Sequence, residues 1–293
     1  MPFEQIANAV QGTDVARLNL LTNGGFEIWQ RGTSFPGANG YCADRWFAGI
    51  QTGTWTVSRD NAVVSSGSNY SAKMVLSGWT SSYNYLRAAL PTVDTALQGK
   101  TITVAVDIYS TASNIVSLRF FTAGSATNPD SRSARNTVTN AWYRASMTMT
   151  VPSDATLVYL DIEQNGNSTV YADNATLVVG SQPADYIPMH PADEGTRCLR
   201  YYEVIGSSVN SINIQGYGAA SGGVACWIPF KVLKAAAPTV TKNGTWVVIN
   251  CGQPSNYSNS NEGFMLYVVA TALGGILISN NATNANFVFE ANP

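Results

Sequence analysis

The side chains of this sequence that could carry out catalysis are few. Its 293 residues include 18 acidic residues, 16 basic residues and a single histidine, His190. His190 lies between Met189 and Pro191 in a proline-rich stretch, whereas a catalytic triad requires a base held rigidly beside its nucleophile. No GxSxG, HExxH or P-loop motif is present. The sequence therefore predicts that the protein is not an enzyme.

A pair of carboxylates that cleaves glycosidic bonds is the alternative chemistry. Four acidic residues fall in stretches with a strand pattern, namely Asp107, Asp161, Glu163 and Asp173. Most of the 18 acidic residues are expected in turns. Binding without catalysis is therefore the preferred interpretation.

Aromatic side chains are a second set that could do chemistry, by stacking on sugars. Several gather in the first half of the chain: Trp46, Trp55, Trp79, Tyr83, Tyr85, Trp142 and Tyr143. Such rings suit sugars, and they equally suit protein cores and subunit interfaces. Residues 79–85 read Trp-Thr-Ser-Ser-Tyr-Asn-Tyr, and the small polar residues favour a solvent-facing loop. We predict carbohydrate contacts from Trp55, Trp79, Tyr83 and Tyr85, with a core or interface position as the alternative.

The composition limits the classes of partner. Apolar residues make up 45% of the chain and charged residues only 12%, about half of what a soluble domain usually carries. The net charge of −2, with basic residues scattered singly, predicts no binding to nucleic acid. No stretch approaches 18 consecutive apolar residues, which predicts no membrane insertion. The cysteines (Cys42, Cys198, Cys226 and Cys251) form no CxxC pair and are predicted to be free thiols.

The elements that would position these side chains are short β-strands. Apolar residues at period two mark strands within 101–109, 116–120 and 158–162. Asn-Gly pairs tolerate the positive φ angles of tight hairpin turns, and they occur at 23–24, 39–40, 165–166 and 243–244. The predicted fold class is therefore all-β, a β-sandwich followed by a second, smaller β-sandwich domain.

Proline and glycine divide the chain into segments. Gly180, Pro183, Pro188 and Pro191 cluster together, and proline cannot donate a hydrogen bond within a sheet. We predict a first sandwich over residues 19–186, a linker over 187–196 and a smaller β-domain over 197–293. Residues 1–18 lack a strand pattern and are predicted to be an N-terminal arm that docks on another protein.

Several motifs resemble those of a known family. Residues 19–32 (NLLTNGGFEIWQRG) look like the opening of the carbohydrate-binding-module type of jelly roll found in bacteriophage tail proteins. Residues 41–46 (YCADRW) are similar to the motif that follows it there. Residues 171–177 (YADNATL) and 198–203 (CLRYYE) resemble the end of the jelly roll and the start of a C-terminal β-domain. The resemblance, over about residues 19–250, implies a jelly-roll first domain and a place in a phage virion.

The resemblance also implies a structural calcium ion. Because the first and last strands of such jelly rolls are neighbours, Glu27 and Asp173 would share the ion with backbone carbonyls near Gly25 and Arg45. Hard oxygen ligands of this kind suit Ca²⁺ rather than a transition metal. The alternative is that Glu27 forms an ion pair with a nearby arginine, Arg31 or Arg45. No other cofactor is expected.

These observations predict a virion structural protein of a bacteriophage, made in the host cytoplasm. We expect a tail fibre or receptor-binding appendage whose first domain contacts a host surface glycan and whose residues 1–18 join other virion proteins. The alternative is a capsid decoration, head-fibre or neck protein with a purely structural role. The second domain is low in charge, and Gly216, Gly218, Gly222 and Gly223 permit close backbone approach, so we predict a homotrimer held through residues 197–293.

Overall fold

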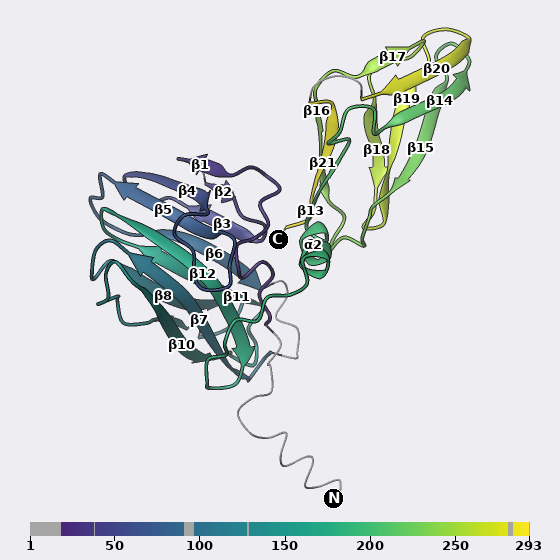
Figure 1. Ribbon diagram of the computed structural model, residues 1–293. Helices are drawn as coiled ribbons and strands as arrows, with labels where there is room; N and C mark the ends of the chain where they lie inside the picture. Colours follow the sequence, from purple (N-terminus) through teal and green to yellow (C-terminus); the bar gives the residue numbers. More distant parts are fainter. Residues whose placement is uncertain (1–18, 38, 91–96, 128, 281–283, 293) are drawn as a thin grey trace, which may run out of the picture. The chain divides into compact units, whose positions relative to one another are not determined.

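The computed structural model describes residues 19–37, 39–90, 97–127, 129–280 and 284–292 (Figure 1). The chain forms two compact units, Met1–His190 and Pro191–Pro293, and their boundary falls inside the predicted linker. The described residues form twenty-one strands and one helix, which confirms the predicted all-β class. The predicted docking arm, residues 1–18, lies outside the described residues. None of the described helices has the length and apolarity needed to cross a membrane.

Two six-stranded antiparallel sheets make up the first unit. Sheet A has the strand order β1 (Ser34–Pro36), β4 (Thr54–Asp60), β5 (Ser71–Ser77), β12 (Ser168–Val179), β7 (Thr101–Ser110) and β10 (Trp142–Thr150). Sheet B has the order β2 (Gly40–Tyr41), β3 (Trp46–Gly49), β6 (Asn84–Leu90), β11 (Leu157–Gln164), β8 (Val116–Ala123) and β9 (Asp130–Arg132). The runs expected as strands at 101–109, 116–120 and 158–162 are confirmed as parts of β7, β8 and β11.

Alternation along each strand separates the core of the first unit from its surface. In β11, Val158, Leu160 and Ile162 are buried in the apolar core between the sheets. Tyr159, Asp161 and Glu163 therefore point to the opposite, outer side of sheet B, because successive side chains in a strand alternate between the two faces.

Residues 20–24 lie beside β12, the last strand of the first unit, as the resemblance implies. The Leu20 amide donates to the Leu177 carbonyl at 2.9 Å, and the Ala175 amide donates to the Gly24 carbonyl at 2.8 Å. A Cβ at Gly24 would overlap the carbonyl oxygen of Ala175, so only glycine allows this approach.

The second unit contains helix α2 (Pro191–Leu199) and three three-stranded antiparallel sheets. Sheet C has the order β13 (Tyr202–Ile205), β21 (Asn286–Glu290) and β16 (Thr239–Asn243). Sheet D has the order β14 (Asn213–Gly218), β20 (Gly274–Ser279) and β17 (Val247–Ile249). Sheet E has the order β15 (Gly223–Pro229), β19 (Gly263–Val269) and β18 (Ser255–Asn259). One apolar cluster joins the three sheets, with Phe264 from sheet E, Ile276 from sheet D and Phe287 from sheet C.

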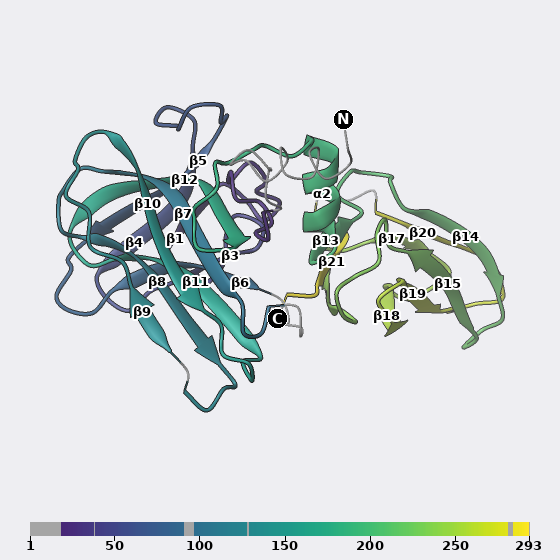
Figure 2. The ribbon, with the colours of Figure 1, turned by 90° about the horizontal axis from the view of Figure 1, so that it is seen from below.

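Residues 191–196, predicted as part of a linker, instead form the first turns of α2, so this part of the prediction is wrong. Proline cannot extend a sheet, but it is well tolerated as the first residue of a helix, where its missing N–H would have no partner. Asp193 and Glu194 in the first turn and Arg197 in the last turn suit the helix dipole. The helix lies beside β13 in both views (Figures 1 and 2).

A buried ion pair ties α2 to sheet C. Lys234 Nζ lies 2.6 Å from Glu203 Oε2, and both side chains are almost completely buried. The same ammonium donates to the carbonyl of Leu199, the last residue of α2. Burial lowers the pKa of Lys234, and the hydrogen bond that Lys234 donates to Glu203 opposes this shift. Neither charged group can reach water in the core. Each therefore stabilises the other in place of hydration.

All four cysteines are free, as predicted. Burial raises the pKa of the Cys42 thiol to about 12, so this side chain behaves as a small apolar residue of the core.

Candidate functional site

A row of charged residues crosses the outer face of sheet B. The strand register places Asp161 of β11 opposite Arg87 of β6 on one side and opposite Arg119 of β8 on the other. Arg119 in turn lies opposite Arg132 of β9. Four neighbouring strands thus bring Arg87, Asp161, Arg119 and Arg132 side by side.

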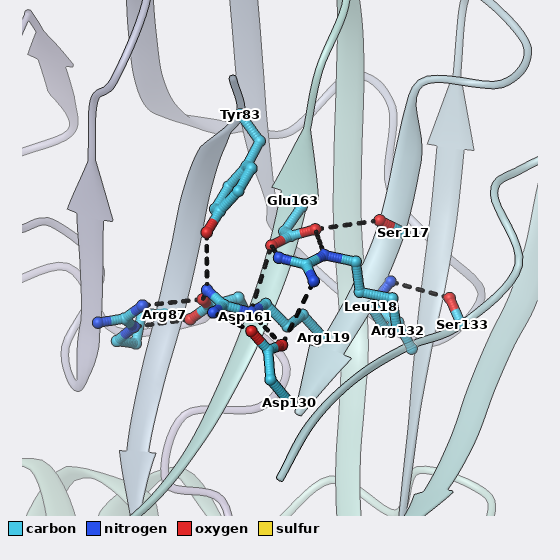
Figure 3. Close-up of polar contacts among 10 residues, drawn as sticks. All are labelled: Tyr83, Arg87, Ser117, Leu118, Arg119, Asp130, Arg132, Ser133, Asp161 and Glu163. Atoms are coloured by element: carbon cyan, nitrogen blue, oxygen red, sulfur yellow. Dashed lines mark hydrogen bonds and ion pairs between the residues drawn. The ribbon is translucent and has the colours of Figure 1, made fainter. Parts of the chain in front are cut away.

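Each carboxylate of this face is held by an arginine in a forked ion pair (Figure 3). Arg87 donates from Nε and Nη2 to the two oxygens of Asp161, at 2.7 and 2.9 Å. Arg132 donates in the same way to Glu163, at 2.8 and 3.1 Å. Asp161 and Glu163 are buried beneath these guanidinium groups. Two parallel hydrogen bonds fix the orientation of both partners.

The third fork lies nearer to solvent. Arg119 donates to both oxygens of Asp130 at 2.7 Å, and 40% of the Asp130 side chain is exposed. The hydrogen bond from Arg119 lowers the pKa of Asp130 below its ordinary value. The three arginines face three carboxylates, so the charges of this face cancel.

Aromatic rings lie among the forks. Phe121 and Tyr159, opposite each other on β8 and β11, stack with their centroids 4.6 Å apart and an interplanar angle of 17°. The guanidinium of Arg87 lies 4.2 Å from the centroid of Tyr85, 4.6 Å from that of Phe121 and 4.9 Å from that of Tyr159. These cation–π contacts give the face flat apolar surfaces beside its hydrogen-bonding groups.

Two tyrosines extend the face toward the start of β6. The hydroxyl of Tyr83 accepts a hydrogen bond from Arg119 Nη1 at 2.9 Å, and its ring centroid lies 6.4 Å from that of Tyr85. A Cβ at Gly49 would overlap the Tyr85 ring, so the missing side chain lets this ring lie across β3.

This arrangement suits the binding of a polyhydroxylated ligand. Guanidinium groups donate, carboxylates accept, and a sugar hydroxyl does both. The rings offer apolar surfaces for the C–H faces of a pyranose. The forks also engage both oxygens of Asp161 and of Glu163, which leaves neither carboxylate free to act as a general acid.

Three of the four aromatic residues predicted to contact carbohydrate remain accessible. Tyr83 and Tyr85 belong to the outer face of sheet B. Trp79 is 37% exposed on the loop before β6, where its indole N–H donates to the Ser82 carbonyl at 2.8 Å. Its contact with carbohydrate stays a prediction.

The prediction for Trp55 is wrong. Only 1% of Trp55 is exposed, and its indole N–H donates to Gln164 Oε1 at 2.8 Å inside the first unit. Trp55 and Val57 occupy the inward positions of β4, and this phase of the alternation places the ring in the core.

Most of the charged and aromatic residues of this face were not predicted from the sequence. Arg87, Arg119, Arg132, Phe121 and Tyr159 received no predicted role. Residues 157–163 (LVYLDIE) alternate apolar with aromatic or acidic side chains, and this period-two pattern is the signal that could have identified one strand of the face.

The two residues proposed to bind calcium contact one loop. Asp173 is buried, and its carboxylate accepts hydrogen bonds from the Ser65 amide at 3.0 Å and the Ser68 hydroxyl at 3.1 Å. Glu27 accepts from the Asn69 amide at 2.7 Å. The Asn174 side-chain oxygen lies 3.0 Å from the same Ser68 hydroxyl.

The chemistry of this oxygen cluster fits a hard cation. Burial raises the pKa of Asp173 to about 7, and among the described residues no lysine or arginine forms an ion pair with it. A cation would relieve the cost of ionising this carboxylate. Of the two arginines named as alternative partners of Glu27, Arg31 and Arg45, Arg31 forms an ion pair with Asp44 at 3.1 Å. The described residues form no cluster of three or more His, Cys, Asp or Glu, so hydroxyl, amide or backbone oxygens would have to complete the shell.

Comparison with known proteins finds similarity only at the level of structure. No family model and no curated protein matches the sequence. The xylan-binding domain CBM22-1 of Xyn10C from Paenibacillus barcinonensis matches with 15% identity and a TM-score of 0.39, over 57% of this chain and 97% of that one. A putative sugar-binding protein from Bacteroides thetaiotaomicron matches with 11% identity and a TM-score of 0.42, over 56% of this chain and all of that one. The enzymatically active domain of tailspike protein 4 from bacteriophage CBA120 matches with 14% identity and a TM-score of 0.40, over 55% of this chain and 21% of that one.

Proposed function

We propose that the first unit binds a neutral glycan on the outer face of sheet B. The observation that carries this proposal is the alternation of forked arginine–carboxylate pairs with the rings of Tyr85, Phe121 and Tyr159 on neighbouring strands. Stacking rings select sugars over small ions, and preoriented planar side chains bind hydroxyl groups without further ordering.

We expect a neutral ligand because the charges of this face are already paired with one another. Every arginine of the face is matched by a carboxylate, at 2.7 Å for Arg87 and Arg119 and at 2.8 Å for Arg132. An acidic sugar would have to compete with these carboxylates for the guanidinium groups. We therefore expect binding that changes little with salt, because no net charge is neutralised on association.

The test is affinity electrophoresis of the full chain in gels that contain neutral polysaccharides (xylan, mixed-linkage β-glucan or galactomannan) or acidic polygalacturonate. The wild-type chain should be retarded by at least one neutral polymer and not by polygalacturonate. Tyr85→Ala should weaken the retardation at least tenfold, and Gly49→Ala should do the same, because its new Cβ displaces the Tyr85 ring.

Tyr109→Ala is the matched control. Tyr109 belongs to sheet A, where it contacts other rings edge to face, with centroids 5.9 Å from Trp142 and 5.6 Å from Tyr171. Its loss should leave retardation unchanged. Equal losses from Tyr85→Ala and Tyr109→Ala, or preferential binding of polygalacturonate, would contradict the proposal.

We also propose a structural Ca²⁺ at Glu27 and Asp173, with Ser68 and Asn174 as neighbouring oxygen donors. The raised pKa of Asp173 and its contact with the Ser65–Tyr70 loop support this assignment. The ion would join the loop and the start of the chain to β12, and its contribution would be to stability rather than to ligand contact.

At the level of the whole protein, we propose a bacteriophage virion appendage of the tail-fibre or receptor-binding type, whose glycan is on the host surface and which docks on other virion proteins through residues 1–18. The support is the resemblance of residues 19–32 and 171–177 to phage tail proteins. Immunogold labelling of intact particles tests this role. Label at the tail is expected, whereas label on the capsid or neck would favour the purely structural role.

The oligomer that we propose is a homotrimer held through residues 197–293. The support is the low charge of the second unit, in which no residue of β14, β15, β17, β18, β19 or β20 is charged. Light scattering at micromolar concentration should give three times the chain mass of 31.2 kDa. A mass of one chain would contradict the trimer.

A further inference from the structure

The outer face of sheet E is an uncharged aromatic surface. The register places Trp227 of β15 opposite Met265 of β19, and Ala225 opposite Tyr267. These side chains lie on the side away from Phe264, Leu266 and Val268, which fill the core. Trp227 is 45% exposed.

Two rings of this face lie over a glycine of the neighbouring strand. A Cβ at Gly263 would come within 2.7 Å of the Trp227 ring. A Cβ at Gly223 would come within 2.5 Å of the Tyr267 hydroxyl and 2.6 Å of its ring. Because one side of each ring covers backbone, the opposite side of each ring faces outward.

Tyr257 and two serines complete the surface. A register shift in β18 between Asn256 and Ser258 leaves Tyr257 unpaired, 68% exposed and with its ring centroid 5.2 Å from that of Tyr267. Ser255 and Ser258 lie opposite Tyr267 and Met265, so hydroxyl groups border the rings. The face thus combines flat ring surfaces with small hydrogen-bonding groups and no charge.

We propose that the outer face of sheet E is a second, independent site for a neutral glycan. Rings whose free sides face outward are complementary to the C–H faces of pyranose rings, and the serine hydroxyls match their hydroxyl edges. The lack of charge excludes recognition of an acidic ligand, because nothing on this face would compensate the ligand's charge on desolvation. The chain would then carry one glycan site in each unit, and both sites on one chain would raise the avidity for a polymer.

The outer face of sheet D differs in composition from that of sheet E. Val247 and Ile249 are 42% and 52% exposed there, and Leu277 lies between Ile249 and Gln215 in the register. This face is mainly aliphatic, with Tyr217 near its end. Aliphatic surface suits contact with another copy of the chain, whereas the rings and hydroxyls of sheet E suit sugar.

The experiment uses the full chain in affinity gels with xylan, mixed-linkage β-glucan and galactomannan. Tyr85→Ala, which disables the face of sheet B, should retain binding to at least one of these polymers. Adding Trp227→Ala to Tyr85→Ala should weaken this residual binding at least tenfold. Tyr257→Ala, at a position that is 68% exposed and does not support the core, should weaken it by a smaller factor.

Tyr217→Ala is the matched control, since Tyr217 is 71% exposed on sheet D of the same unit. It should leave binding unchanged. The proposal is overturned if Tyr85→Ala binds none of the three polymers, or if Trp227→Ala and Tyr217→Ala have equal effects. It is also overturned if Trp227→Ala lowers the mass in light scattering while binding persists, because a second copy of the chain would then cover this face. If the sheet B site does not exist, Tyr85→Ala alone has no effect and Trp227→Ala still does, so the two proposals fail separately.

Discussion

The two units differ in how they use charge at their surfaces. In the first unit, three of the four edge strands carry a proline or a charged residue: Pro36 in β1, Asp130 and Arg132 in β9, and Arg144 in β10. In the second unit, none of the residues of sheets D and E is charged, and of their four edge strands only β15 carries a proline, Pro229 at its end. Charged residues and prolines are the usual means of preventing one edge strand from pairing with another chain.

This difference indicates different surroundings for the two units. The first unit carries three arginines and three carboxylates in forks on the outer face of sheet B, where Asp161 and Glu163 are buried and 40% of the Asp130 and Arg132 side chains is exposed. The second unit exposes several large apolar side chains from uncharged strands, including Tyr217, Trp227, Ile249 and Tyr257. Exposed apolar side chains of this kind, on the outer faces of sheets D and E, favour contact with a ligand or with another chain. Among the charged residues of the second unit, Lys234 and Glu203 form a pair in the interior, whereas others such as Lys242 and Glu262 are exposed.

The largest expected effect comes from removing that interior pair. Lys234→Ala leaves the buried carboxylate of Glu203 with only the exposed ammonium of Lys231, 3.9 Å away, and breaking a buried ion pair typically costs about 3–5 kcal/mol. Calorimetry should show an earlier transition for the second unit and an unchanged one for the first.

Lys231→Ala is the control for this prediction. Lys231 reaches the same carboxylate at 3.9 Å, but 68% of its side chain is exposed. Its loss should shift the transition little, because exposed ion pairs contribute less than about 1 kcal/mol. If both variants destabilise equally, charge in the second unit acts at the surface, and the contrast between the units fails.

The proposed calcium site tests the contrast between the two units within the first unit. At a hundredfold excess over its dissociation constant, a bound ion adds about 2.7 kcal/mol of stability. Chelator should therefore lower the melting temperature of the first unit only, and Asp173→Ala should abolish the response. A melting curve that does not move when calcium is removed would contradict the site.

The pH dependence without calcium has a definite sign. The pKa of Asp173 rises from 3.8 to about 7 on folding, so between these values the folded state keeps a proton that the unfolded state has lost. The stability contribution of this residue should therefore fall as the pH rises from about 4 through about 7. Asp173→Asn should flatten this part of the profile measured by thermal unfolding, and an unchanged slope would contradict the assignment.

A smaller effect is expected from Asp161→Ala on the outer face of sheet B. The side chain of Arg87 is 21% exposed, so water can partly replace its lost partner. We expect a loss of about 2 kcal/mol in stability, within the range for an unsatisfied polar group, together with the loss of glycan retardation. Retained retardation would show that the forks are not needed for binding.

The smallest effect concerns the tryptophan that proved to be buried. Trp55→Phe keeps an aromatic ring in the core and removes the 2.8 Å hydrogen bond to Gln164. The expected loss is about 1 kcal/mol, with no change in glycan retardation. A loss of binding would restore Trp55 as a contact residue.

The sequence predicted the strands well because alternating apolar residues such as Ile102, Val104 and Val106 all fill the core. It did not place Trp55 correctly, although Trp55 and Val57 alternate with Thr54, Thr56 and Ser58, a period-two pattern that marks the apolar side of β4. It also did not predict the charged row, because Arg87, Arg119 and Arg132 are far apart in sequence and are brought together only by the strand order of sheet B. Pro191 was misassigned because proline ends strands and begins helices, and only the following residues decide between them.

The rings that lie over glycines have a consequence for how this protein can change. Tyr85 with Gly49, Tyr267 with Gly223 and Trp227 with Gly263 are pairs in which each position limits the other. A larger residue at any of these glycines requires a smaller one at its partner. Related sequences should therefore vary at both members of a pair together. When one of these glycines is replaced by alanine, the new Cβ displaces the ring above it. The measured loss of binding would then be ascribed to the glycine, although the displaced ring is its cause.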